Sequence, residues 1–175
     1  MIVVLRRYSQ HIARMCVMGW LEKGIMRKKR SVLLAVLVLL VGVQFVPVNR
    51  TNPGGGVEIV APADVKAVLE RSCYDCHSNE TKWPWYSHLA PVSWIIAHDV
   101  TEGREHLNFS VWGEYAAKDR AHLSEEVVEE VSKGGMPIKA YLFLHRGAKI
   151  RPGEVDVLKA WARTEMAAGS DGISH

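Results

Sequence analysis

The sequence predicts an all-α protein, and three observations support this class. Apolar residues recur at helical spacing through residues 62–167. Residues typical of helix starts and ends flank these segments. No segment alternates apolar and polar residues as a half-buried strand does. The 175 residues therefore divide into an apolar N-terminal segment and one helical domain.

The N-terminal part combines positive charge with an apolar run. Residues 32–48 read VLLAVLVLLVGVQFVPV, and the four residues 27–30 before them are all basic. A helix of this length spans about 25 Å, close to the ~30 Å hydrocarbon core of a bilayer. Because basic residues stay cytoplasmic, we predict a cytoplasmic N-terminus over 1–30 and a single-pass signal anchor over 31–48. The domain that follows would face the periplasm from the inner membrane.

A cleaved signal peptide is the alternative to this anchor. Its apolar region is usually shorter and ends at a small-residue cleavage site, which this sequence lacks. Residues 1–25 differ from an ordinary basic leader, and a start at Met26 would supply one. We therefore interpret residues 1–25 as a mis-assigned start or a short cytoplasmic tail.

The exported part carries a different charge. Residues 1–48 have a net charge of +7, whereas residues 49–175 have fourteen basic and eighteen acidic residues, a net charge of −4. The folded part thus lacks the basic surface of a nucleic-acid-binding domain, and no nucleic-acid partner is expected. We expect an unpacked Pro/Gly linker over 49–61, the folded domain over 62–167 and a tail over 168–175.

Four helices are predicted in this domain from their boundary residues. The first covers 62–71 and the second covers 91–105, each with proline at its start. Ser124 is a candidate N-cap for the third, which would end at Gly134. The fourth would begin at Pro152.

One motif carries a specific chemistry. Residues 73–77 read Cys-Tyr-Asp-Cys-His, the C-x-x-C-H pattern of covalent haem attachment. On a helical turn, positions i, i+3 and i+4 share a face, so Cys73, Cys76 and His77 would form one patch. Two thiols there can bond the porphyrin edge while the imidazole binds iron. We predict one covalent haem c, attached with the help of the cytochrome c maturation machinery.

Two other interpretations of the cysteine pair compete with haem attachment. A thioredoxin-like pair belongs in a βαβ unit, and the sequence predicts no strands. A zinc site needs two further ligands at regular spacing, and no second C-x-x-C follows. The third cysteine, Cys16, lies before the predicted anchor and has no expected role.

The sixth iron ligand is predicted to be Met136. Gly134 and Gly135 precede it, which permits a close backbone approach to a flat ring, and Pro137 stiffens the loop. A core-filling role for Met136 is the alternative interpretation, as is an open sixth position. The competing ligands are His98, His106 and His145.

An aromatic cluster follows the motif. Trp83, Trp85 and Tyr86 are expected to pack on the porphyrin rim, with their polar tips near the propionates. An ordinary aromatic core is an equally open interpretation.

With these motifs in place, the sequence resembles a known family. The stretch from CYDCHSNETKWPWYSHLAPVSW through MPIKAYLFLHRGAKI resembles the bacterial haem-binding domain family of small membrane-anchored cytochrome c-like proteins. The resemblance covers about residues 30–165. It implies a cytochrome c-like helical fold and a distal Met-Pro contact, here Met136 and Pro137.

Together these patterns predict an electron-transfer cytochrome rather than an enzyme. Its expected partners are membrane-associated redox proteins. A haem-based sensor or gas-binding module with an exchangeable sixth ligand is the alternative, and haem peroxidase activity is a third hypothesis.

Overall fold

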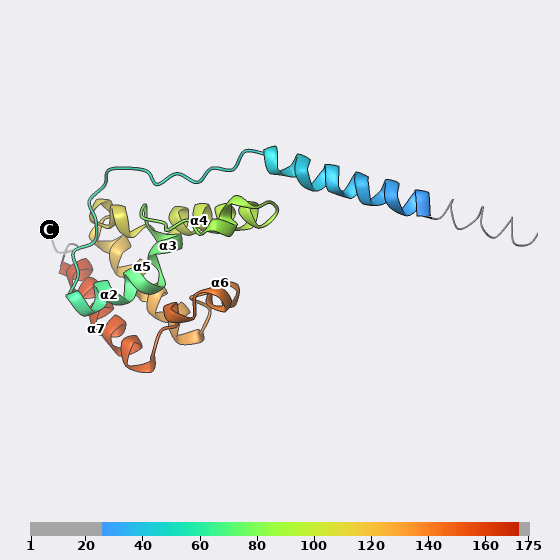
Figure 1. The fold of residues 1–175 in the computed structure, drawn as a ribbon. Coiled ribbons are helices and arrows are strands. Elements are labelled where there is room, and N and C mark those ends of the chain that lie inside the picture. Colours follow the sequence, from blue (N-terminus) through green and yellow to red (C-terminus); the bar gives the residue numbers. More distant parts are fainter. Residues whose placement is uncertain (1–25, 172–175) are drawn as a thin grey trace, which may run out of the picture. The chain divides into compact units, whose positions relative to one another are not determined.

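The computed structural model describes residues 26–171, and this range is helical without any strand (Figure 1). The predicted all-α class is therefore confirmed. Internal contacts divide the chain into two units, one ending at Pro47 and the other beginning at Val48. The predicted cytoplasmic tail over 1–25 and residues 172–175 lie outside the described range.

The described residues of the first unit form a helix. It covers residues 26–42 and continues into the 3-10 helix η1 (Val43–Phe45), after which Val46 is extended. Its apolar side chains are exposed, among them Leu34 and Val38. The predicted anchor over 31–48 thus overlaps this helix only to residue 42. Within residues 26–171, no helix combines the length and the apolar character required to cross a bilayer.

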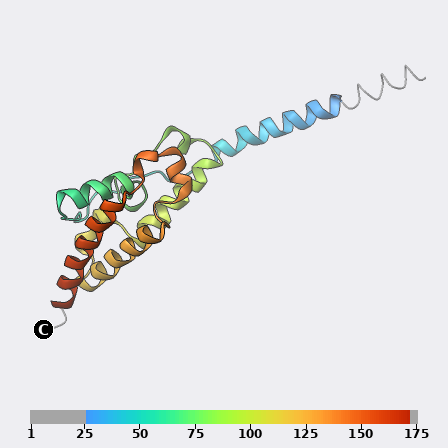
Figure 2. The ribbon, with the colours of Figure 1, turned by 90° about the horizontal axis from the view of Figure 1, so that it is seen from below.

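The second unit is built from short helices joined by irregular segments (Figure 1). Its elements in chain order are α2 (Ala63–Ser72), α3 (Tyr74–His77), η2 (Trp85–His88), α4 (Val92–His106), η3 (Phe109–Glu114), α5 (Ala117–Lys133), α6 (Lys139–Leu144), η4 (Arg146–Ala148) and α7 (Pro152–Asp171). The longest pair, α5 and α7, lie side by side (Figure 2).

Three of the four predicted helices begin within one residue of their expected starts, namely α2, α4 and α7. The third prediction was wrong at its start, because α5 begins at Ala117 rather than after Ser124. Ser124 is fully buried inside the helix, and its hydroxyl donates to the Ala121 carbonyl. A serine that bonds the preceding turn is tolerated in a helix interior. The predicted end of this third helix is confirmed, because Gly134 follows α5 with a left-handed φ of 73°.

The core joins α2, η3 and α7 through aromatic and aliphatic side chains. Leu69, Phe109 and Leu158 are fully buried. Trp112 lies between Phe109 and Trp161, with ring centroids 5.8 Å and 5.5 Å away. Such clusters add specific ring contacts to the burial of apolar area. This core supports the C-terminal end of α2, where the cysteine motif begins.

The segment expected to be an unpacked linker is exposed over residues 51–57, but it contacts the domain near its end. Ile59 is buried, and its amide donates to the Phe109 carbonyl at 3.0 Å. The Gly113 amide donates to the Val57 carbonyl at 2.8 Å. Gly56 has a φ of 106° and approaches η3 so closely that a Cβ would lie 2.5 Å from the Ser110 oxygen. Gly56 therefore permits a close approach to η3, whereas composition alone had indicated a flexible chain.

Candidate functional site

The cysteine motif forms a helical turn directly after α2. Cys73 ends α2 and precedes α3, and its carbonyl accepts from the Cys76 amide at 3.2 Å and from the His77 amide at 2.9 Å. This turn directs the two thiols and the imidazole toward one cleft. Its lining includes Cys73, Cys76 and His77. The predicted patch of Cys73, Cys76 and His77 is therefore present.

The ring of His77 is fixed by two backbone carbonyls. Its Nδ1 lies 2.9 Å from the Gly103 oxygen and 3.2 Å from the Leu107 oxygen, both at the end of α4. Because a carbonyl can only accept, Nδ1 carries the proton and Nε2 keeps its lone pair. Histidine ligands of metals are oriented in this way by a hydrogen bond from their other nitrogen. Burial also lowers the pKa of His77, which favours the neutral ligand form.

Gly103 allows α4 to contact the motif. A Cβ at this position would lie 2.7 Å from the Cys76 carbonyl oxygen and 3.3 Å from the Cys76 Cβ. Only glycine fits such a backbone contact without a shift of the helix. The same residue therefore permits the close packing and supplies the carbonyl that orients His77.

The two thiols are free and protonated. Burial raises the pKa of Cys73 to about 12 and that of Cys76 to about 11. Redox-active cysteine pairs require a lowered thiol pKa in an electropositive setting, so the electrostatics oppose the thioredoxin-like interpretation. The zinc interpretation also lacks support, since residues 26–171 contain no group of three His, Cys, Asp or Glu side chains placed to hold a metal ion.

The cleft has a volume of about 490 Å³, within the roughly 300–1,000 Å³ of ordinary cofactor sites. One part of its lining comes from α3 and α4, and another comes from α5 and the residues before α6. Its apolar lining residues are Leu107, Phe109, Leu123, Val127, Val131, Pro137 and Ile138. An apolar cleft that also presents two free thiols and an oriented imidazole fits a haem.

Acidic side chains surround the apolar lining. They are Asp75, Asp99, Glu102, Glu126, Glu129 and Glu130. None of the described residues that line the cleft is Lys or Arg. Burial raises the pKa of Asp99, so this carboxyl is less readily ionised than an aspartate in water. The propionates of a haem would find no basic side chain in this lining.

Met136 lines the same cleft and is 40% exposed. Its amide and that of Gly135 donate to the Glu130 carbonyl, just after Gly134 ends α5. The structure thus brings the predicted iron ligands His77 and Met136 to one cleft from different elements. Gly134 and Gly135 were expected to permit a close backbone approach to a flat ring. Their main role in the structure is to end α5, where Gly134 adopts its positive φ.

Of the three histidines that compete with Met136 as the sixth iron ligand, only His106 lines the cleft. Its exposed ring faces Glu126, with Nε2 3.3 Å from Oε2. His98 is exposed and pairs with Glu102. His145 does not line the cleft, and its ring stacks on Tyr141 at 4.2 Å.

The predicted aromatic rim is not part of the cleft lining. The Trp83 Nε1 donates to Asn52 at 3.2 Å, and Trp85 is 75% exposed. Tyr86 reaches the site only indirectly, because its hydroxyl lies 3.2 Å from Nε2 of His145. Phe109, which sequence reasoning did not select, supplies an aromatic ring to the cleft instead.

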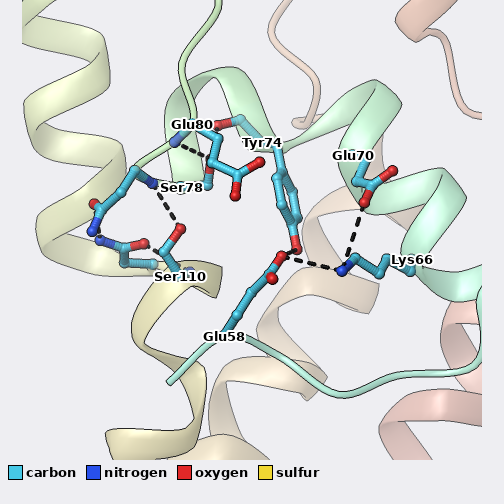
Figure 3. A network of polar contacts seen from close by, with 9 residues as sticks. Glu58, Lys66, Glu70, Tyr74, Ser78, Glu80 and Ser110 are labelled. Carbon is cyan, nitrogen blue, oxygen red and sulfur yellow. Dashed lines mark hydrogen bonds and ion pairs between the residues drawn. The ribbon is translucent and has the colours of Figure 1, made fainter. Parts of the chain in front are cut away.

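A polar network supports the motif from outside the cleft (Figure 3). The Tyr74 hydroxyl donates to Glu58 at 3.0 Å, and Lys66 pairs with the same carboxylate at 3.3 Å. The Ser78 hydroxyl donates to the Tyr74 carbonyl at 2.7 Å and accepts from the Glu80 amide. Figure 3 shows the Glu58 carboxylate between Tyr74 and Lys66, so the turn is held by contacts beyond its own backbone.

Besides Phe109, sequence reasoning missed Gly103 and Tyr141. Gly103 interrupts a helical pattern, and an isolated glycine of this kind often marks close packing. That signal was present, although its partner Cys76 could not be named from sequence. Tyr141 lines the cleft and donates to Asp75 at 2.7 Å. No local pattern indicates a contact between residues so distant in the chain.

Comparison with known proteins supports the haem assignment. The sequence profile of the family described as "Haem-binding domain" matches residues 38–164. Neither the curated proteins nor the solved structures yield a significant match to this chain. The matched region includes the cysteine motif, the cleft and Met136 and spans well over half of the sequence. The protein therefore belongs to the haem-binding domain family.

Proposed function

We propose that this protein is a monohaem c-type cytochrome that transfers electrons at the periplasmic face of the inner membrane. One observation carries the proposal: Cys73, Cys76 and His77 line one cleft together with Met136. In this assignment the thiols attach the haem, His77 binds the iron, and Met136 supplies the sixth ligand. The helical domain would then be cytochrome c-like.

The chain's own residues perform distinct tasks in this proposal. Addition of a thiol to a vinyl group needs reduced cysteines, and Cys73 and Cys76 are free. The carbonyls of Gly103 and Leu107 hold the proton on Nδ1 of His77, so Nε2 keeps the lone pair that would bind a haem iron. The apolar lining would exclude water from the face of a bound haem.

A bound haem supplies reversible one-electron chemistry at its iron. A thioether ligand raises the reduction potential relative to two histidines. The acidic lining acts in the opposite direction, because negative charge near the iron disfavours electron gain. The protein thus tunes the potential through both its ligand and its charges.

The membrane location is proposed from the sequence. The apolar run 32–48 and the basic residues 27–30 support an N-terminal anchor with the haem domain outside the cytoplasm. Its partners would be membrane-associated redox proteins and, during assembly, the cytochrome c maturation machinery. Full-length protein should remain in the membrane pellet after alkaline carbonate washing and be digested by protease added to spheroplasts. Release by carbonate, or protection from the protease, would contradict this location.

The ligand assignment is tested with the full chain produced in a cytochrome c-maturing host. The ferric wild type should show the weak far-red absorption band typical of methionine-ligated haem. Met136→Ala should lose this band and bind carbon monoxide in the ferrous state at neutral pH, because the sixth position opens. Met166→Ala is the matched control, since Met166 lies on α7 and does not line the cleft. A band that survives Met136→Ala would remove Met136 from the iron.

A gas-binding module is the second candidate, and the exposure of Met136 favours it. At 40% exposed, this side chain is not locked by core packing. Rapid carbon monoxide binding by the wild-type ferrous protein would indicate an exchangeable ligand and support sensing. Slow or undetectable binding would support electron transfer.

A further inference from the structure

The segment that carries Met136 has little packing of its own. Residues 132–147, termed the distal segment, contain α6, and none of their side chains is buried. Phe143 and Leu144 are 76% and 58% exposed. Elements with few buried apolar contacts lie at the low-stability end of a fold. Polar contacts must therefore contribute much of what holds this segment in place.

One of these contacts reaches the cysteine motif. The Tyr141 hydroxyl donates to Oδ2 of Asp75 at 2.7 Å, and Asp75 stands between Cys73 and Cys76. Oδ1 of the same carboxylate accepts from the Lys82 amide at 3.1 Å, which fixes its orientation. Burial and the bond to Asp75 raise the pKa of Tyr141, so its hydroxyl remains a donor at neutral pH.

A second contact braces the tyrosine ring. His145 stacks on Tyr141 with ring planes 16° apart, and its Nδ1 lies 3.1 Å from the Tyr141 carbonyl. That carbonyl requires the proton on Nδ1, so Nε2 accepts from the Tyr86 hydroxyl at 3.2 Å. Tyr86 belongs to η2, which packs on α4. The distal segment is thus attached at two points to the part of the fold that carries His77.

We propose that the hydrogen bond from Tyr141 to Asp75 is a clasp that holds the distal segment in place and controls how readily Met136 leaves the iron. Tyr141 is a positioning residue in this scheme, because it acts through the segment that carries Met136. The inference rests on the proposed function, since it assigns a control to the same site. It connects the motif that holds the proximal ligand with the segment that holds the distal one.

The test compares full-length holoprotein of the wild type with Tyr141→Phe, Asp75→Ala and the double variant. Loss of a hydrogen bond to a charged group should accelerate amide exchange in residues 138–145 about tenfold. The rate of carbon monoxide binding to the ferrous protein should rise by a similar factor, about tenfold. The double variant should resemble either single variant, because both remove the same contact.

Tyr115→Phe is the matched control. Its hydroxyl accepts from the Asn108 amide at 3.1 Å and does not reach α6. This variant should leave carbon monoxide binding at the wild-type rate, which separates the clasp from a general loss of stability.

Three other results would each contradict a stated part of the inference. Unchanged exchange in Tyr141→Phe would show that the hydroxyl does not hold α6. Faster exchange with unchanged carbon monoxide binding would restrict Tyr141 to a structural role and refute ligand control. A wild type without covalent haem would refute the proposed function and ligand control together, while amide exchange would still measure the clasp.

Discussion

Replacing both Cys73 and Cys76 with serine is expected to abolish covalent haem attachment. The two thiols of the cleft are the only cysteines among the described residues, so no other described side chain can form a thioether. Acid acetone should extract all porphyrin from the double variant and none from the wild type. Haem staining after denaturing electrophoresis would provide a second measurement.

Cys16→Ser is the control for this experiment. Cys16 lies outside the described residues, and the sequence assigns it no role. Its replacement should leave covalent haem at the wild-type level. The attachment proposal would fail if the double variant retained covalent haem, or if the wild type released all of its porphyrin.

Gly103→Ala is expected to disrupt the contact between α4 and the cysteine turn. The new Cβ would lie 2.7 Å from the Cys76 carbonyl oxygen, so α4 must move away. Overpacking of this kind destabilises a fold by about 1–3 kcal/mol. For a domain of this size, the midpoint of thermal unfolding should fall by roughly 4–12 °C. The yield of holoprotein should also fall, because the carbonyl that orients His77 moves with the helix.

Gly153→Ala separates this clash from the general effect of alanine in a helix. Gly153 lies in the first turn of α7 with open space around its Cα. Alanine there should raise stability slightly, by up to about 1 kcal/mol, through helix propensity alone. Equal unfolding midpoints for Gly103→Ala and the wild type would show that α4 does not need this close approach.

Local signals in the sequence predicted much of the fold. The starts of α2, α4 and α7 follow from proline and from apolar periodicity, and the end of α5 follows from Gly134. The start of α5 was not recoverable, because a serine that caps a helix and one that bonds inside it look alike. α6 was also missed, since a short helix without buried residues leaves no apolar period.

The sequence by itself determined the proximal half of the site. C-x-x-C-H encodes its geometry within one helical turn, so local spacing suffices to place Cys73, Cys76 and His77. Met136 was a plausible choice from its glycine and proline neighbours, and the structure brings it to the same cleft. Trp83, Trp85 and Tyr86 lie near the motif in sequence but not in the cleft lining, because proximity in sequence does not determine which side chains line a cleft.

Only the tertiary structure decided the contacts between distant segments. The approach of Gly103 to Cys76, the bond from Tyr141 to Asp75 and the aromatic lining by Phe109 join residues from separate helices. The contacts of the linker belong to the same class, because Gly56 and Ile59 find their partners in η3. Helical spacing specifies which residues share a face, but packing alone decides which faces meet.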